Sequence, residues 1–148
     1  MPKEKIGIEL KYKTKEATFR ENGETFNLKQ HGAQNLGRFD FFDDLRRLQL
    51  LKKENIIEKG YAIFLTNEPL YWRPIQRKNF SSNFSMEDEK IIESNSKLDW
   101  NGNPSQGSVT RKRLFPNNPI IIENKHQLKW NEFSNLKRIS FKYLMIEI

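Results

Sequence analysis

The feature that most constrains this sequence is the alternation of apolar and charged residues between Ile6 and Lys13. In an extended strand, successive side chains point to opposite faces, so the two kinds of residue separate onto two faces. The apolar face carries Ile6, Ile8, Leu10 and Tyr12, and the charged face carries Glu9, Lys11 and Lys13. The sequence therefore predicts an amphipathic strand at this position.

Glu9 and Lys11, two residues apart on one face, have two interpretations. The ordinary one is that a half-buried strand turns a charged face to water. The chemical one is the Glu-x-Lys half of a metal-dependent phosphodiesterase site. In such a site the carboxylate holds a divalent cation, and the ammonium orients water or balances charge on the phosphate.

The Glu-x-Lys pair is accompanied by several further segments that carry a family resemblance. Together they are similar to a bacterial branch of the PD-(D/E)xK, or restriction-endonuclease-like, superfamily. The segments are Ile6–Lys15, Lys29–Gln34, Arg38–Phe41, Gly60–Asn67, Tyr71–Trp72 and Phe141–Leu144. The resemblance implies an α/β (α+β) fold with a mixed central sheet and a flanking helix. It also implies nucleic-acid cleavage that depends on Mg²⁺ or Mn²⁺, with Glu9 as metal ligand and Lys11 as catalytic residue.

The family pattern includes an Asp on a strand before the Glu-x-Lys, and this sequence departs from it. Glu4 is the only acid before Glu9. At about 3.3 Å per residue, the preceding residues cannot form a strand and a turn. We therefore expect a core that lacks its first strand, with the first metal-binding carboxylate missing, supplied from elsewhere in the chain, or lost by a truncated start. If the helix start faces Glu9, Asp40 and Asp43 are candidate metal ligands in place of the missing Asp. The alternative is that acids in a first turn cap amides or favour the helix dipole.

Gln34 precedes the expected helix, where the family often places a polar residue near the site. We count it as a catalytic candidate, with a loop or capping role as the alternative.

Composition bounds the other possibilities. The 148 residues fit one domain. Within it, we expect 1–72 to be the nuclease-like core and 73–148 to be its β-rich continuation, which adds an antiparallel β region.

No apolar run approaches the roughly 20 residues needed to span a membrane, and the N-terminus does not lead into a signal peptide. The absence of cysteine excludes disulfides and thiolate zinc sites, and suits the cytoplasm. The formal charge of +7 favours polyanionic partners.

Local patterns predict most of the remaining elements. Asn22-Gly23 predicts a hairpin turn between strands in 17–28. A helix is expected from about 39 to 55, with Asp40, Asp43 and Asp44 in its first turn and Lys52 and Lys53 in its last. Residues 61–65 read as a strand buried on both faces.

The second half is expected to contain short antiparallel strands around the loop at 101–108. Strands are predicted at 109–115, at 119–122 and at 140–148, the last in the interior of the sheet, and one helical turn is predicted at 129–135.

Basic and aromatic residues form the candidate nucleic-acid contacts. Arg111, Lys112 and Arg113 follow the loop and are placed to clamp phosphates, or to protect an edge strand from pairing. Trp72 with Arg73 can stack on a base and grip its phosphate, or Trp72 packs against the sheet. Lys13 continues the charged face of the first strand.

Three hypotheses follow. The first is a Mg²⁺-dependent nuclease acting on DNA in preference to RNA. The second is a catalytically degenerate relative that binds nucleic acid or a protein. The third is a structural subunit that forms a homodimer or takes a strand from a partner chain.

Overall fold

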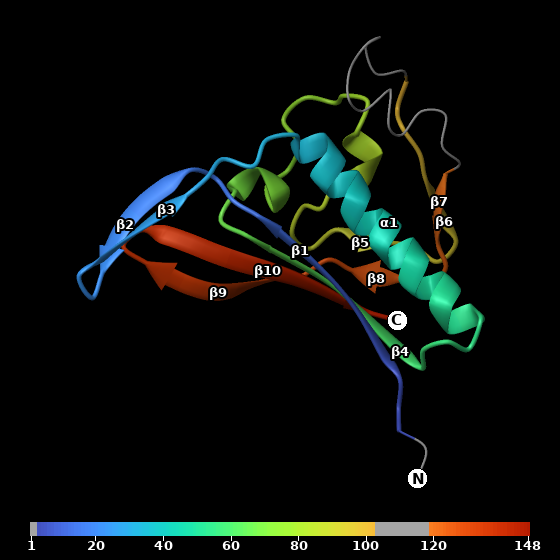
Figure 1. Cartoon of the computed structure of the whole chain (residues 1–148). Coiled ribbons are helices and arrows are strands. Elements are labelled where there is room, and N and C mark those ends of the chain that lie inside the picture. Colours follow the sequence, from blue (N-terminus) through green and yellow to red (C-terminus); the bar gives the residue numbers. More distant parts are fainter. Residues whose placement is uncertain (1–2, 103–118) are drawn as a thin grey trace.

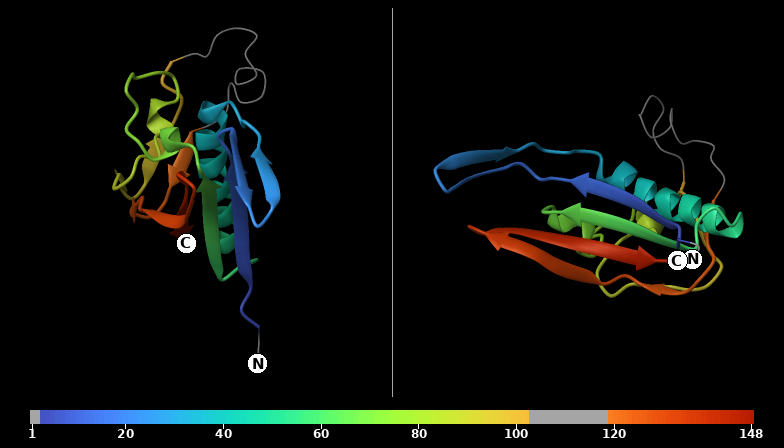
Figure 2. Two further views of the ribbon diagram at one scale, coloured as in Figure 1. Left: turned by 90° about the vertical axis from the view of Figure 1, so that its left-hand side faces the viewer. Right: turned by 60° about the horizontal axis from the view of Figure 1, so that its bottom comes forward.

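The computed structural model describes residues 3–102 and 119–148, and its centre is a four-stranded mixed sheet (Figure 1). The strand order is β1 (Ile6–Lys13), β4 (Lys59–Thr66), β10 (Ile139–Glu147) and β9 (Trp130–Leu136). β1 and β4 are parallel, and the other two pairs are antiparallel. Helix α1 (Gln34–Lys53) covers one face of this sheet (Figure 2). The expectation of a mixed sheet with a flanking helix is confirmed, and the nuclease core stays a prediction.

The predicted hairpin is present as β2 (Ala17–Glu21) and β3 (Glu24–Leu28). Asn22 and Gly23 both have positive φ, 49° and 81°, as the two-residue turn requires. The hairpin projects from one end of the sheet (Figure 1). Lys137, in the turn between β9 and β10, contacts it through an ion pair of 3.3 Å with Glu21.

Helix α1 begins at Gln34, earlier than predicted, because packing rather than a cap holds its first turn. Ala33, at the N-cap, makes no side-chain capping hydrogen bond. Gly37 lies so close to Tyr71 that a Cβ there would be 2.4 Å from the phenol oxygen. The expectation that Asp40, Asp43 and Asp44 occupy the first turn is therefore wrong, whereas Lys52 and Lys53 do lie in the last turn. No helix in the described ranges is long and apolar enough to cross a membrane.

The hydrophobic core lies between α1 and the sheet. The helix, β4 and β10 contribute Phe41, Phe42, Leu45, Leu48, Ala62, Phe64, Leu144 and Ile146. The same core continues through apolar residues of later segments, among them Phe84, Met86, Ile92, Leu98, Ile120 and Ile122. β4 alternates, with Gly60, Ala62, Phe64 and Thr66 buried and the opposite face half-buried, so the prediction that both faces are buried is wrong. β10 is interior to the sheet, as predicted.

The helical turn predicted at 129–135 is wrong, because this segment is β9. It pairs with β10, which supplies partners for its backbone. Trp130 also anchors it by donating its indole N–H to the carbonyl of Met86 at 2.7 Å. Hairpin pairing with β10 and the bond to Met86 thus override the helical pattern.

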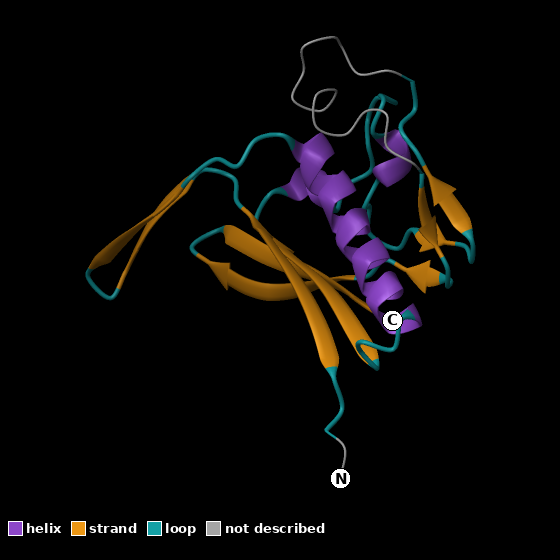
Figure 3. Cartoon of the chain, turned by 45° about the vertical axis from the view of Figure 1, so that its right-hand side comes forward, coloured by secondary structure: helices purple, strands orange, loops and turns teal. Residues whose placement is uncertain are grey.

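Short antiparallel pairs complete the structure beside α1 (Figure 3). β5 (Ile91–Ile92) pairs with β8 (His126–Gln127), and β6 (Ser96–Leu98) pairs with β7 (Ile120–Ile122). Two 3-10 helices, η1 (Pro69–Tyr71) and η2 (Ser82–Phe84), precede them. The predictions of short antiparallel strands and of a strand at 119–122 are confirmed, and the strand predicted at 109–115 lies outside the described residues.

Candidate functional site

The charged face of β1 points toward α1, and its apolar face points outward. Ile6, Ile8, Leu10 and Tyr12 are 50%, 65%, 64% and 47% exposed, while Glu9, Lys11 and Lys13 are half-buried. The separation of the two faces is as predicted. The charged face is only partly open to water, because the side chains of Glu9 and Lys11 are 32% and 27% exposed.

Lys11 meets a buried carboxylate from the helix. Its ammonium Nζ lies 3.3 Å from Oδ2 of Asp44, whose side chain is 2% exposed. Asp44 is on the buried side of α1, between Phe41 and Leu48. An ion pair in this position loses hydration on both partners, so packing alone gives little reason for it.

Arg47 joins three carboxylates into one cluster with Lys11. Its Nε lies 3.3 Å from Oε1 of Glu9, its Nη1 lies 3.2 Å from Oδ2 of Asp43, and its Nη2 donates to Oδ1 of Asp44. We call Glu9, Lys11, Asp43, Asp44 and Arg47 the acidic–basic cluster. β1 supplies its first two members and α1 the other three.

Burial dominates the electrostatics of Asp44. It raises the pKa of this carboxyl, and the charge of Glu9 adds to the rise. The charges of Lys11 and Arg47 act in the opposite direction, but the pKa remains above its ordinary value. The ionised carboxylate is therefore held at some cost in free energy.

The resemblance implies magnesium, and the carboxylates of Glu9 and Asp44 are the donors closest to that role. Magnesium sites commonly use one or two carboxylates, with water and substrate phosphate completing the shell. Within 3–102 and 119–148, no group of three or more His, Cys, Asp or Glu side chains is arranged to hold a metal ion. Here both carboxylates contact Arg47, so a metal bound by Glu9 and Asp44 would have to displace this guanidinium.

Asp44 was missed by sequence reasoning, which favoured Asp40 and Asp43. Asp43 belongs to the cluster through Arg47 and also pairs with Arg46 at 2.8 Å. The sequence does carry a signal for Asp44: it interrupts the apolar stripe of Phe41, Leu45 and Leu48 at helical spacing.

Asp40 and Gln34 lie nearer the start of the helix. Burial raises the pKa of Tyr71 to about 12, and the charges of Glu68 and Asp40 contribute to that rise. Asp40 therefore acts on the phenol of Tyr71. Gln34 is the first residue of α1 and is half-buried, so it begins the helix and does not precede it.

The nucleic-acid candidates have separate locations. The ring of Trp72 packs 5.8 Å from that of Trp130, and the ammonium of Lys142 lies 5.2 Å from its centre. Of the two roles considered for Trp72, stacking on a base and packing against the sheet, these contacts correspond to packing. Arg73 is exposed beside it, and Lys13 ends β1. Arg111, Lys112 and Arg113 lie outside the described residues.

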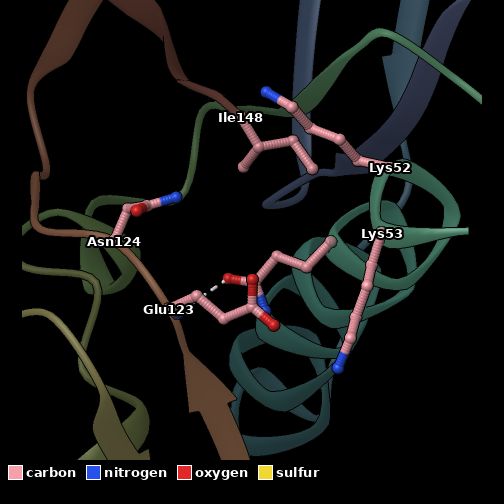
Figure 4. A pocket seen from close by; sticks show the side chains of 6 residues that line it. Lys52, Lys53, Glu123, Asn124 and Ile148 are labelled. Atoms are coloured by element: carbon pink, nitrogen blue, oxygen red, sulfur yellow. Dashed lines mark hydrogen bonds between the residues drawn. The ribbon is translucent and has the colours of Figure 1, made fainter. Parts of the chain in front are cut away.

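A pocket of about 400 Å³ lies at the C-terminal end of α1 (Figure 4). Lys52 and Lys53 line it from the helix, with Glu123 on the opposite side. Gln49 bridges the two sides: its amide donates to the carbonyl of Ile121 at 2.8 Å and accepts from the amide of Glu123 at 3.0 Å. These bonds hold β7 against α1, so we treat this pocket as a packing feature.

Comparison of the chain with family models, with curated proteins and with solved structures gives no match. The chemistry of the site must therefore be argued from its own residues.

Proposed function

We propose that this chain is a metal-dependent phosphodiesterase of the nuclease type, with the acidic–basic cluster as its reaction centre. The observation that carries the proposal is the ion pair between Lys11 and the buried Asp44, next to Glu9. A strand that needed only a solvated charged face would turn these side chains outward. Charges that are held at an energetic cost are characteristic of functional sites.

Each residue has a role that follows from its chemistry. Lys11, still 27% exposed at its side chain, balances negative charge on the phosphate being attacked. Glu9 and Asp44 would hold the metal, which would lower the pKa of water and polarise the phosphate. Arg47, whose side chain is 43% exposed, neutralises both carboxylates in this structure.

The partner in this proposal is nucleic acid. The formal charge of +7 attracts a polyanion without sequence preference. Lys11, Lys13 and Arg47 bring cationic groups to the cluster itself.

A second function, binding without cleavage, is favoured by one observation. Arg47 contacts Glu9, Asp43 and Asp44 together, which satisfies these carboxylates without a metal. A degenerate relative that binds nucleic acid would retain this arrangement.

The test is a cleavage assay on single- and double-stranded DNA and RNA with Mg²⁺ or Mn²⁺. It compares the parent with Glu9→Gln, with Asp44→Asn and with the exposed control Glu58→Gln. We expect the parent and the control to cut, and the two site variants to lose cutting. If the parent binds the same oligonucleotides in both metals and never cuts them, the binding function replaces the enzyme.

A further inference from the structure

A second pocket, of about 260 Å³, lies where the parallel strands β1 and β4 end. Three chain segments meet there: the connection from β1 to β2, the segment after β4, and the turn between β9 and β10. Its lining includes Lys15, Trp72 and Arg138, with Glu16 as its one acid. Lys142 adds another positive charge beside Trp72, 5.2 Å from the ring centre. The pocket is therefore mainly cationic.

The backbone around Lys15 is fixed by a buried side chain. The amide of Asn67, which is 8% exposed, accepts from the Lys15 N–H at 2.7 Å and donates to the Lys15 carbonyl at 3.1 Å. This bidentate contact continues the pairing of β1 with β4 beyond the ends of both strands. Lys15 is thus held at the rim of the pocket by a rigid part of the fold.

Arg138 reaches the pocket from a strained turn. Lys137 and Arg138 have φ values of 48° and 72°, the left-handed region in which Asn and Gly are favoured. Lys137 uses this position to pair with Glu21. A two-residue hairpin turn requires positive φ at both positions, so the turn accounts for these values. Arg138 lines the pocket, so the turn places its cation there.

The pocket and the acidic–basic cluster are joined by one chain segment. Lys11, Lys13 and Lys15 follow one another at intervals of two residues. In extended backbone this interval is about 6.6 Å, comparable to the distance between successive phosphates along an extended nucleic-acid strand. The segment therefore spaces its cations for one strand, and a cationic groove that follows the backbone is typical of single-strand binding.

We infer that this pocket binds a backbone phosphate of a single nucleic-acid strand through Lys15 and Arg138, a few nucleotides from the phosphate at Lys11. Lys13 bridges the two positions. The location of the scissile phosphate rests on the proposed function, whereas the binding of the strand at the pocket does not depend on cleavage.

The test is fluorescence anisotropy with a labelled single-stranded DNA of 12 nucleotides in EDTA, titrated over a range of salt concentrations. The decisive variant is Arg138→Gly, because glycine relieves the strained φ while removing the cation. We expect its Tm to rise and its affinity to fall about fivefold, with a salt slope shallower by about 0.7, the loss of one phosphate contact. A purely structural role for Arg138 would not couple higher stability with weaker binding.

Two matched controls separate the effects. Ala33→Gly relieves a similar φ of 60° at the start of α1 and should raise Tm without changing affinity. Lys125→Ala removes a cation that pairs with Glu93 at 3.5 Å and should leave the salt slope unchanged.

The proposal is overturned if Arg138→Gly binds with the parent's affinity and salt slope. Evidence for a small-anion site would also overturn it. Such a site would show two results: inorganic phosphate and a mononucleotide displace the oligonucleotide equally well, and the oligonucleotide binds no more tightly than either of them. Equal or tighter binding of the matching duplex would overturn the single-strand assignment. Failure of the proposed function alone would give a different result: no cleavage would be observed, and these differences in binding would remain.

Discussion

The ammonium of Lys11 lies 3.3 Å from a carboxylate oxygen of Asp44, and the Asp44 side chain is only 2% exposed. A strand residue and a helix residue thus meet as opposite charges on the interior face of the sheet. The contact joins the inward face of β1 to α1, and Gly7 on the same face packs closely against Ile57 and Leu48. This orientation leaves the apolar residues of that strand in contact with water, an arrangement that hydrophobic burial alone does not favour.

Asp44 is expected to matter more for activity than for stability. Burial raises the pKa of this carboxyl, so the folded protein holds its charged form at a cost that an amide avoids. We expect Asp44→Asn to change the free energy of unfolding at pH 7 by no more than about 1 kcal/mol, since Lys11 and Arg47 are exposed enough to be hydrated. Cleavage should fall by about 100-fold or more.

Urea unfolding and the cleavage assay measure the two effects of Asp44→Asn on the same preparations. A loss of several kcal/mol in stability would show that the ion pair is structural, and the functional argument for Asp44 would then fail.

The outward direction of the apolar face of β1 predicts a contrast between two apolar truncations. Leu10 is 64% exposed and Phe64, on the buried face of β4, is 0% exposed. We expect Leu10→Ala to cost less than about 0.5 kcal/mol in unfolding free energy, and Phe64→Ala to cost about 3–5 kcal/mol. Chemical denaturation compares them, and equal costs would mean that β1 is turned the other way.

His126 predicts a pH dependence of stability. Its ring is partly buried in β8 with Nε2 lacking a hydrogen-bond partner, and burial lowers its pKa below the ordinary 6.5. As the pH falls below about 6.5, the unfolded chain takes up the proton before the folded protein does, so stability is lost. Above that pH the contribution is fully present.

The measurement for His126 is urea unfolding between pH 8 and pH 5, with His126→Gln beside the parent. The parent should lose stability relative to the variant as pH falls, by up to about 1.4 kcal/mol for each unit by which the pKa is lowered. His31→Gln serves as the control on the other histidine. Parallel curves for the parent and His126→Gln would contradict the prediction.

Local sequence was sufficient for elements that local chemistry determines. Asn22-Gly23 predicted its hairpin because both residues accept positive φ. The alternation in Ile6–Lys13 predicted β1 and the composition of its two faces. Which face turns inward depends on contacts with residues distant in sequence, Asp44 and Ile57 among them, and the pattern alone does not contain that information.

The errors arise where pairing or packing between elements decides the structure. Residues 129–135 form β9 because β10 pairs with them, and α1 begins early because Gly37 packs closely on Tyr71. For the site, Glu9 and Lys11 were identified from their spacing. Asp44 and Arg138 were not identified. Helix packing sets the position of Asp44, and the turn between β9 and β10 sets the position of Arg138.

The measurement that tests the central claim most directly is cleavage of labelled single- and double-stranded oligonucleotides by the parent and by Lys11→Ala, with Mg²⁺ or Mn²⁺ and with EDTA. Lys129→Ala, an exposed lysine before β9, is the matched control. The account predicts metal-dependent cutting by the parent and the control, and its loss in Lys11→Ala with the circular dichroism spectrum unchanged. Cutting by Lys11→Ala at the parent's rate, or no cutting by the parent in either metal, would contradict the account.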